Sequence, residues 1–109
     1  LLIMGYTFKE NCSDFRNNQS VKLRDFFIKN GAKVDIYDPL LDQLKFKKTY
    51  KFNLIKSIKT NKYDIIAIMV SHKNFVNMGI KNIIKYSKKN NIIFDFKNIF
   101  KDKKNTFRL

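Results

Sequence analysis

Short apolar runs alternate with segments whose apolar residues recur at helical spacing. The runs predict strands near 1–5, 33–37, 64–70 and 92–96. The run at 64–70 is continuous and rich in β-branched residues, which is typical of a central parallel strand covered on both faces. With helices between the strands, the pattern predicts one doubly wound α/β domain with a mainly parallel sheet.

Two helices follow from the spacing, over 20–30 and 80–90. The first has an apolar face and ends before Gly31, a residue that suits a helix terminus. Its face carries Val21, Leu23, Phe26 and Phe27. Asn17, Asn18 or Ser20 is suited to cap its start.

The rest of the chain gives weaker patterns. Residues 40–44 are compatible with a helical turn, and 46–52 with a short strand or a loop. A short basic helix is expected over 53–61, with its Leu and Ile side chains inward. A short strand is compatible with 106–109.

Polar loops follow three of the expected strands, at 6–17, 71–75 and 97–98. If the strands are parallel, these loops converge on one edge of the sheet, where ligands bind in open α/β folds. The loops bring together Lys9, Arg16, Ser71, His72 and Lys97. Cations beside a helix start favour an anion such as a phosphate group.

The composition narrows the function classes. The chain has 109 residues, enough for one core, and its 44% hydrophobic content with 11 Phe indicates a folded domain. The net charge of +14 fits a nucleic-acid surface, or a genome whose codon bias places Lys on solvated faces. Lys is scattered over the whole chain and Arg occurs only at 16, 24 and 108, so the second interpretation is favoured.

Several kinds of chemistry find little support. Cys12 and His72 are a weak signal for a nucleophile and its base, and one Cys with one His does not suggest a metal site. Neither GxGxxG nor GxxxxGK[ST] occurs. No apolar run approaches the roughly 20 residues that cross a bilayer. Because the chain opens with Leu inside an apolar run, it is expected to be a fragment of a longer protein.

Four blocks resemble a known family. The sequence GYTFKENCSDFRN at 5–17 is similar to the G-x-[TA]-F-K-E-[ND]-x-x-D-x-R-[NS] signature of the UDP-glucose/GDP-mannose dehydrogenases, the nucleotide-sugar 6-dehydrogenases. VDIYDP at 34–39, YDIIAI at 63–68 with SHKNF at 71–75, and IFDFKNIF at 93–100 resemble further family motifs in the same order. The resemblance covers nearly the whole chain and is to the C-terminal, UDP-binding domain. The form of the first block and Lys97 look most like the enzymes that oxidise UDP-N-acetylhexosamines for surface polysaccharides.

The resemblance implies a Rossmann-like three-layer domain over 1–109, belonging to a longer cytoplasmic enzyme that oxidises carbon 6 of the sugar in two NAD-dependent steps. By position, Phe8, Lys9 and Lys97 would contact the UDP-sugar. Arg16 would reach the NAD held mainly by an N-terminal domain. No catalytic residue falls within this chain, because the family's nucleophilic Cys lies in a Cys-x-x-Lys-Asp motif elsewhere. The implied partners are the N-terminal and central domains, and the full enzyme is expected to be a homo-oligomer that binds neither membrane nor nucleic acid.

Two departures from the family pattern fall in the expected site. Ser13 replaces the usual Pro and Asn98 replaces the usual Gly, and Asn adopts a positive φ less readily than Gly. No turnover is expected from these 109 residues alone. The alternatives are a basic α/β nucleic-acid-binding module without enzymatic activity, and a decayed gene remnant that keeps the fold but has no partner domain.

Overall fold

A computed structural model describes residues 1–6, 19–40, 54–96, 99–100 and 106–107. It contains a five-stranded sheet with the order β2-β1-β3-β4-β5, in which every neighbouring pair is parallel. The strands are β1 (Leu2–Met4), β2 (Asp35–Tyr37), β3 (Tyr63–Ile68), β4 (Ser87–Asp95) and β5 (Thr106–Phe107). The predicted parallel sheet is therefore confirmed, including a short strand in the tail.

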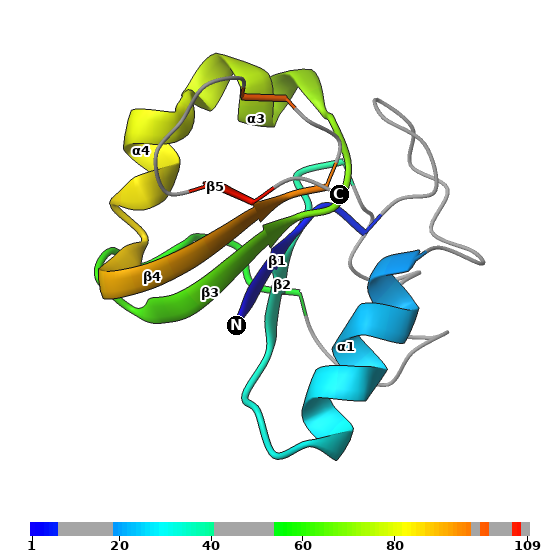
Figure 1. Ribbon diagram of the computed structural model, residues 1–109. Coiled ribbons are helices and arrows are strands. Elements are labelled where there is room, and N and C mark those ends of the chain that lie inside the picture. Colours follow the sequence, from blue (N-terminus) through cyan, green and yellow to red (C-terminus); the bar gives the residue numbers. More distant parts are fainter. Residues whose placement is uncertain (7–18, 41–53, 97–98, 101–105, 108–109) are drawn as a thin grey trace.

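Helices lie on both faces of the sheet, as a doubly wound fold requires (Figure 1). Helix α1 (Gln19–Lys29) lies on one face, while α3 (Lys73–Met78) and α4 (Ile80–Ile84) lie on the other. The predicted end of α1 is confirmed: Gly31 has a φ of +87°, and its amide donates to the Ile28 carbonyl at 3.1 Å.

The sheet divides the core into two layers. On the α3 and α4 face, Met4, Ile66, Ile68 and Ile93 of the strands pack with Phe75 of α3. On the α1 face, the buried side chains include Ile3, Ile36, Ala67 and Met69, with Leu23 of α1 packed against them. Alternate residues of β3 enter opposite layers, which explains why this strand is continuously apolar from Ile65 to Ile68.

The helix predicted over 53–61 is wrong for its described part, residues 54–61, which form bends and turns. The amide of Ile55 donates to the Ile36 carbonyl at 2.9 Å, so the chain runs beside the edge strand β2. Leu54 then enters the α1-side core, and Ile55 and Ile58 pack against the other layer. An extended segment can send consecutive side chains to opposite faces, whereas in a helix they lie only about 100° apart.

Two further boundaries differ from the prediction. The helix expected over 80–90 ends at Ile84, because Ser87 Oγ bonds the Ile84 carbonyl at 2.6 Å and the chain then pairs with β3. Residues 73–75, predicted as part of a loop, open helix α3.

The apolar face predicted for α1 is only partly buried. Leu23 packs on the sheet, but the Phe26 side chain is 61% exposed. The helical turn predicted at 40–44, apart from Leu40, and the segment at 46–52 lie outside the described residues, as do Asn17 and Asn18.

Candidate functional site

The carboxyl ends of β1, β2 and β3 meet at a buried Asp–His hydrogen bond. Asp38 follows β2 and His72 follows β3, and the Asp38 carboxylate lies 3.1 Å from His72 Nε2. Both side chains have 0% exposure. The backbone amide of Tyr6, just beyond β1, donates to the same carboxylate oxygen at 2.7 Å. One carboxylate therefore ties together three strand ends that lie far apart in the sequence.

The protonation of this pair follows from its contacts. Burial alone would raise the pKa of Asp38, but the hydrogen bonds from His72 and from the Tyr6 and Leu40 amides outweigh burial and lower the pKa below its usual value. Asp38 is therefore ionised at neutral pH and can only accept hydrogen bonds. His72 Nε2 must then carry a proton and donate it.

Gly5 lies at the end of β1, where no other residue fits without strain. Its φ is +96°, and a Cβ built at Gly5 would lie 2.8 Å from the Val70 Cβ. Its amide donates to the Tyr37 carbonyl at 2.9 Å. The strand end thus sits directly against the neighbouring strand segments.

A second contact closes the segment that follows. The buried Ser20 hydroxyl, in the first turn of α1, donates to the Gly5 carbonyl at 2.8 Å. Ser20 is therefore not the helix cap that the sequence allowed it to be. Gly5 and Tyr6 precede residues 7–18, and Ser20 follows them. The residues on both sides of this segment therefore meet in one buried cluster, which we call the polar root and which consists of Gly5, Tyr6, Ser20, Asp38 and His72.

Asp95 does the same for the end of β4. Its carboxylate has 0% residue exposure and accepts the Ile99 amide at 2.8 Å and the Phe100 amide at 2.7 Å. These amides come immediately after residues 97–98. The carboxyl edge of the sheet therefore carries two segments whose described flanks are held by buried polar side chains, Asp38 and Ser20 for the first and Asp95 for the second.

The predicted site residues fall into two groups. Phe8, Lys9, Cys12, Asp14 and Arg16 lie in 7–18, and Lys97 lies in 97–98, all outside the described residues. Their convergence on one rim stays a prediction, but the described residues on either side of both segments lie at the same edge of the parallel sheet. Ser71 and His72 do reach this edge, and His72 is buried with Asp38 as a structural hydrogen-bonding group.

Asp38, Asp95 and Tyr6 lie within the family-like blocks of the sequence, but no role was predicted for them, and Ser20 was predicted only as a possible helix cap. An available signal was an Asp directly at the end of an apolar run, as in IYD and IFD. A carboxylate there is well placed to accept the amides of the chain that turns away from the sheet.

Within the described part of the chain, no cluster of three His, Cys, Asp or Glu residues could hold a metal ion. In the same part, no helix has the length and hydropathy of a membrane span.

The sequence of this domain matches a known protein family. The model of the UDP-glucose/GDP-mannose dehydrogenase family, UDP binding domain, matches residues 2–102. The chain therefore belongs to this family and corresponds to its UDP binding domain.

Individual relatives agree with this assignment. The chain is 33% identical over 109 residues to UDP-N-acetyl-D-glucosamine 6-dehydrogenase from Salmonella typhi, covering 100% of this chain and 26% of that protein. It is 31% identical over 99 residues to UDP-N-acetyl-D-mannosamine dehydrogenase from Methanococcus aeolicus, covering 88% of this chain and 21% of that protein. The chain thus spans about a quarter of the length of these relatives.

The fold is also shared with a solved structure, the UDP-N-acetyl-mannosamine dehydrogenase Cap5O from S. aureus, with a TM-score of 0.72. The match covers 98% of this chain and 24% of that one at 19% sequence identity. It confirms the Rossmann-like architecture.

Proposed function

We propose that these 109 residues bind the nucleotide part of a UDP-sugar as the C-terminal domain of an NAD-dependent nucleotide-sugar 6-dehydrogenase. The supporting observation is the buried polar root, made up of Gly5, Tyr6, Ser20, Asp38 and His72, because its contacts hold the residues on both sides of the segment that carries the family signature. The substrate is a UDP-hexose or UDP-N-acetylhexosamine, oxidised to the uronic acid for polysaccharide biosynthesis. The relatives' names favour an N-acetylhexosamine.

The roles of individual residues follow from the family signature. Phe8 and Lys9 contact the nucleotide-sugar, and Lys97 contacts the substrate from the neighbouring segment. Charge-assisted hydrogen bonds from Lys suit the diphosphate, which carries negative charge at neutral pH. Arg16 reaches the NAD that is bound by the N-terminal domain.

NAD supplies the hydride acceptor when it is bound in the complete enzyme. This chain's own residues orient the substrate and hold its charge, and they carry no nucleophile for the oxidation. The full enzyme has N-terminal and central domains, forms a homo-oligomer and acts in the cytoplasm, where nucleotide-sugars and NAD are available.

The test is titration calorimetry of the 109-residue chain with UDP. We expect saturable 1:1 binding, and we expect Lys9→Ala to weaken it by roughly 10- to 100-fold, because a charge-assisted hydrogen bond contributes about 1.5–3 kcal/mol. Lys81→Ala is the matched control, since it removes the same charge from the exposed surface of α4.

A nucleic-acid-binding module would behave differently. Its affinity for single-stranded DNA would fall steeply with salt, and UDP would not compete. Equal effects of Lys9→Ala and Lys81→Ala, with no UDP preference, would overturn the proposal. NADH production by the 109-residue chain with UDP-sugars and NAD would contradict the assignment of catalysis to other domains.

A further inference from the structure

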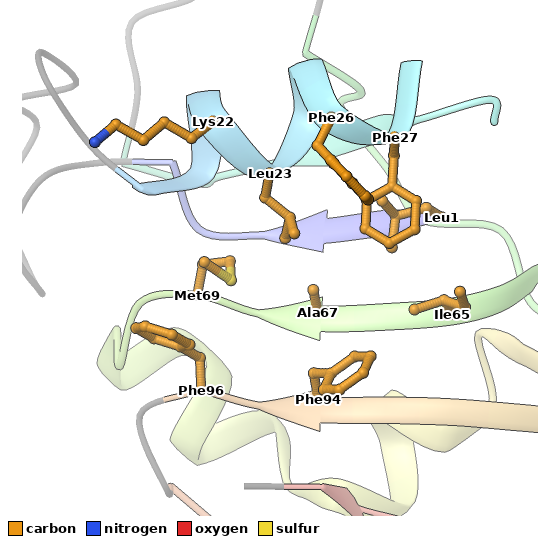
Figure 2. Close-up of a pocket in the computed structure, with 10 residues that line it drawn as sticks. All are labelled: Leu1, Lys22, Leu23, Phe26, Phe27, Ile65, Ala67, Met69, Phe94 and Phe96. Carbon is orange, nitrogen blue, oxygen red and sulfur yellow. The ribbon is translucent and has the colours of Figure 1, made fainter. Parts of the chain in front are cut away.

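An apolar groove lies on the α1 face of the sheet (Figure 2). Its volume is about 490 Å³. Leu23, Phe26 and Phe27 of α1 form one side, while Ala67, Met69 and Phe94 of the strand region form the floor. Lys22 is the only charged side chain among its ten lining residues. The groove lies apart from the polar root at the carboxyl edge.

The groove exists because the two faces of the sheet are covered unequally. On one face α3 and α4 pack over β3 and β4, whereas α1 is the only described helix on the other face (Figure 1). Phe26 is 61% exposed, and Ile92, on the same face of β4 as Phe94, is 39% exposed. Parallel strands that are apolar on both faces normally have both faces covered, so this face lacks a layer among the described residues.

The open strip has the dimensions of one helix. Residues 65–69 span about 16 Å at 3.3 Å per residue, and a helix of that length has about 11 residues at 1.5 Å rise. Helix α1, which lies beside the strip, also has 11 residues. A second helix alongside α1 would complete the layer.

The charges around the groove indicate the chemistry of that helix. A second depression shares Leu1, Phe27 and Ile65 with the groove and carries three lysines and two aspartates. They are Lys33, Lys62, Lys88, Asp35 and Asp64. Lys62 pairs with Asp35 at 3.1 Å and Lys88 with Asp64 at 3.5 Å, so with Lys22 the surroundings are net basic. An occupant with acidic residues along its edge is therefore favoured.

We infer that the groove receives an amphipathic helix, apolar on one face and acidic along its edge, from the part of the dehydrogenase polypeptide outside these 109 residues. This inference rests on the proposed function, because the relatives have about three-quarters of their length beyond the matched region. The groove is then a domain interface, distinct from the edge that binds the nucleotide.

The experiment compares one substitution in two contexts. In the 109-residue chain, Phe26→Lys replaces a largely exposed side chain and should leave the melting temperature unchanged within about 1 °C. In a fusion where this chain replaces the matching quarter of the Salmonella typhi dehydrogenase, the same change should lower the melting temperature by roughly 3 °C or more, because it places a charge in a buried interface.

Val76→Lys is the matched control. Val76 is 46% exposed on α3, on the opposite face, so the change should have the same effect in both contexts. Equal shifts for Phe26→Lys in the two contexts would overturn the inference. So would a concentration-dependent dimer of the 109-residue chain that Phe26→Lys dissociates, because the occupant would then be a second copy.

A photo-crosslinking measurement covers the case in which the fusion does not fold. The 109-residue chain with p-benzoylphenylalanine at position 26 is co-produced with the first three-quarters of the Salmonella typhi enzyme. A crosslink to that segment supports the inference, and its absence, or a crosslink only to a second copy, contradicts it. UDP titration of the same chain tests the nucleotide site separately, so either proposal can fail while the other stands.

Discussion

At the carboxyl edge of the sheet, the side chains of Asp38 and His72 are fully buried, whereas at the amino edge Asp35 and Lys62 keep 31% and 47% of their side-chain exposure. The nitrogen–oxygen separation is the same in the two pairs, 3.1 Å. The separation alone therefore does not indicate how much a pair contributes to the stability of the fold. Exposed pairs contribute at most about 1 kcal/mol, while removing one partner of a buried pair costs about 3–5 kcal/mol.

The two edges also differ in what their carboxylates hold. Asp38 accepts two backbone amides besides His72, so it fixes the path of the chain. Asp35 accepts the Tyr63 hydroxyl at 2.6 Å and the Lys62 ammonium, both from side chains. At the carboxyl edge, where the candidate site lies, a buried carboxylate thus fixes the backbone by accepting its amides.

The difference between the two edges is tested most directly by removing each carboxylate separately. Asp38→Ala should lower the free energy of unfolding by about 3–5 kcal/mol, because it leaves buried donors without an acceptor. Asp35→Ala should cost about 1 kcal/mol, since water can replace its contacts. Urea unfolding followed by circular dichroism measures both. If Asp38→Ala unfolds the chain, Asp38→Asn gives the intermediate case, and equal losses at the two positions would refute the distinction.

A smaller loss is expected from Gly5→Ala. A methyl group at Gly5 would meet the Val70 side chain at 2.8 Å and would also strain a backbone with positive φ, which together should cost about 2–3 kcal/mol. Gly79→Ala is the control, because Gly79 has a φ of +81° but nothing within 4 Å of an added Cβ. The difference between the two melting temperatures isolates the close approach, and a zero difference would show that the strand end has room to move.

Acid should produce the smallest effect, because protonation leaves the Asp38 oxygens in place. The pKa of Asp38 is lowered in the folded chain, so the unfolded chain binds more protons between the two pKa values and stability rises with pH there. The contribution is complete above the unfolded carboxyl pKa of about 4 and is lost as the pH falls further.

Asp38→Asn lacks this contribution but keeps that of Asp35, whose pKa is also lowered. The free energies of unfolding of the wild-type chain and the Asn variant should therefore converge as the pH falls below about 4, the unfolded carboxyl pKa, as measured by urea titrations. Parallel curves would show that Asp38 does not change its proton affinity on folding.

Much of the fold could be predicted because its signals are local. The continuous run at 64–70 and the Gly31 terminus gave β3 and the end of α1 from neighbouring residues alone. Helix α3 was missed because it has six residues, of which only Phe75 is buried, so no apolar period can repeat. Phe26 was placed inward because helical spacing fixes a side chain's face and carries no information on how far the covering sheet extends.

Less of the candidate site than of the fold could be predicted from the sequence. Its edge was predictable, since parallel strands must end together. The pairing of Asp38 with His72 was not, because the two residues are 34 positions apart and each alone is an ordinary polar residue after a strand. Lys9, Arg16 and Lys97 stand out by charge, whereas the residues that hold their segments are buried.

The root at Gly5 and Ser20 has an evolutionary consequence. The described contacts that close it, from Asp38, Tyr37 and Ser20, all arise outside residues 7–18. Substitutions within residues 7–18 therefore leave the donors and acceptors of these flanking contacts unchanged, so the sequence of that segment can vary in evolution without loss of its anchoring groups.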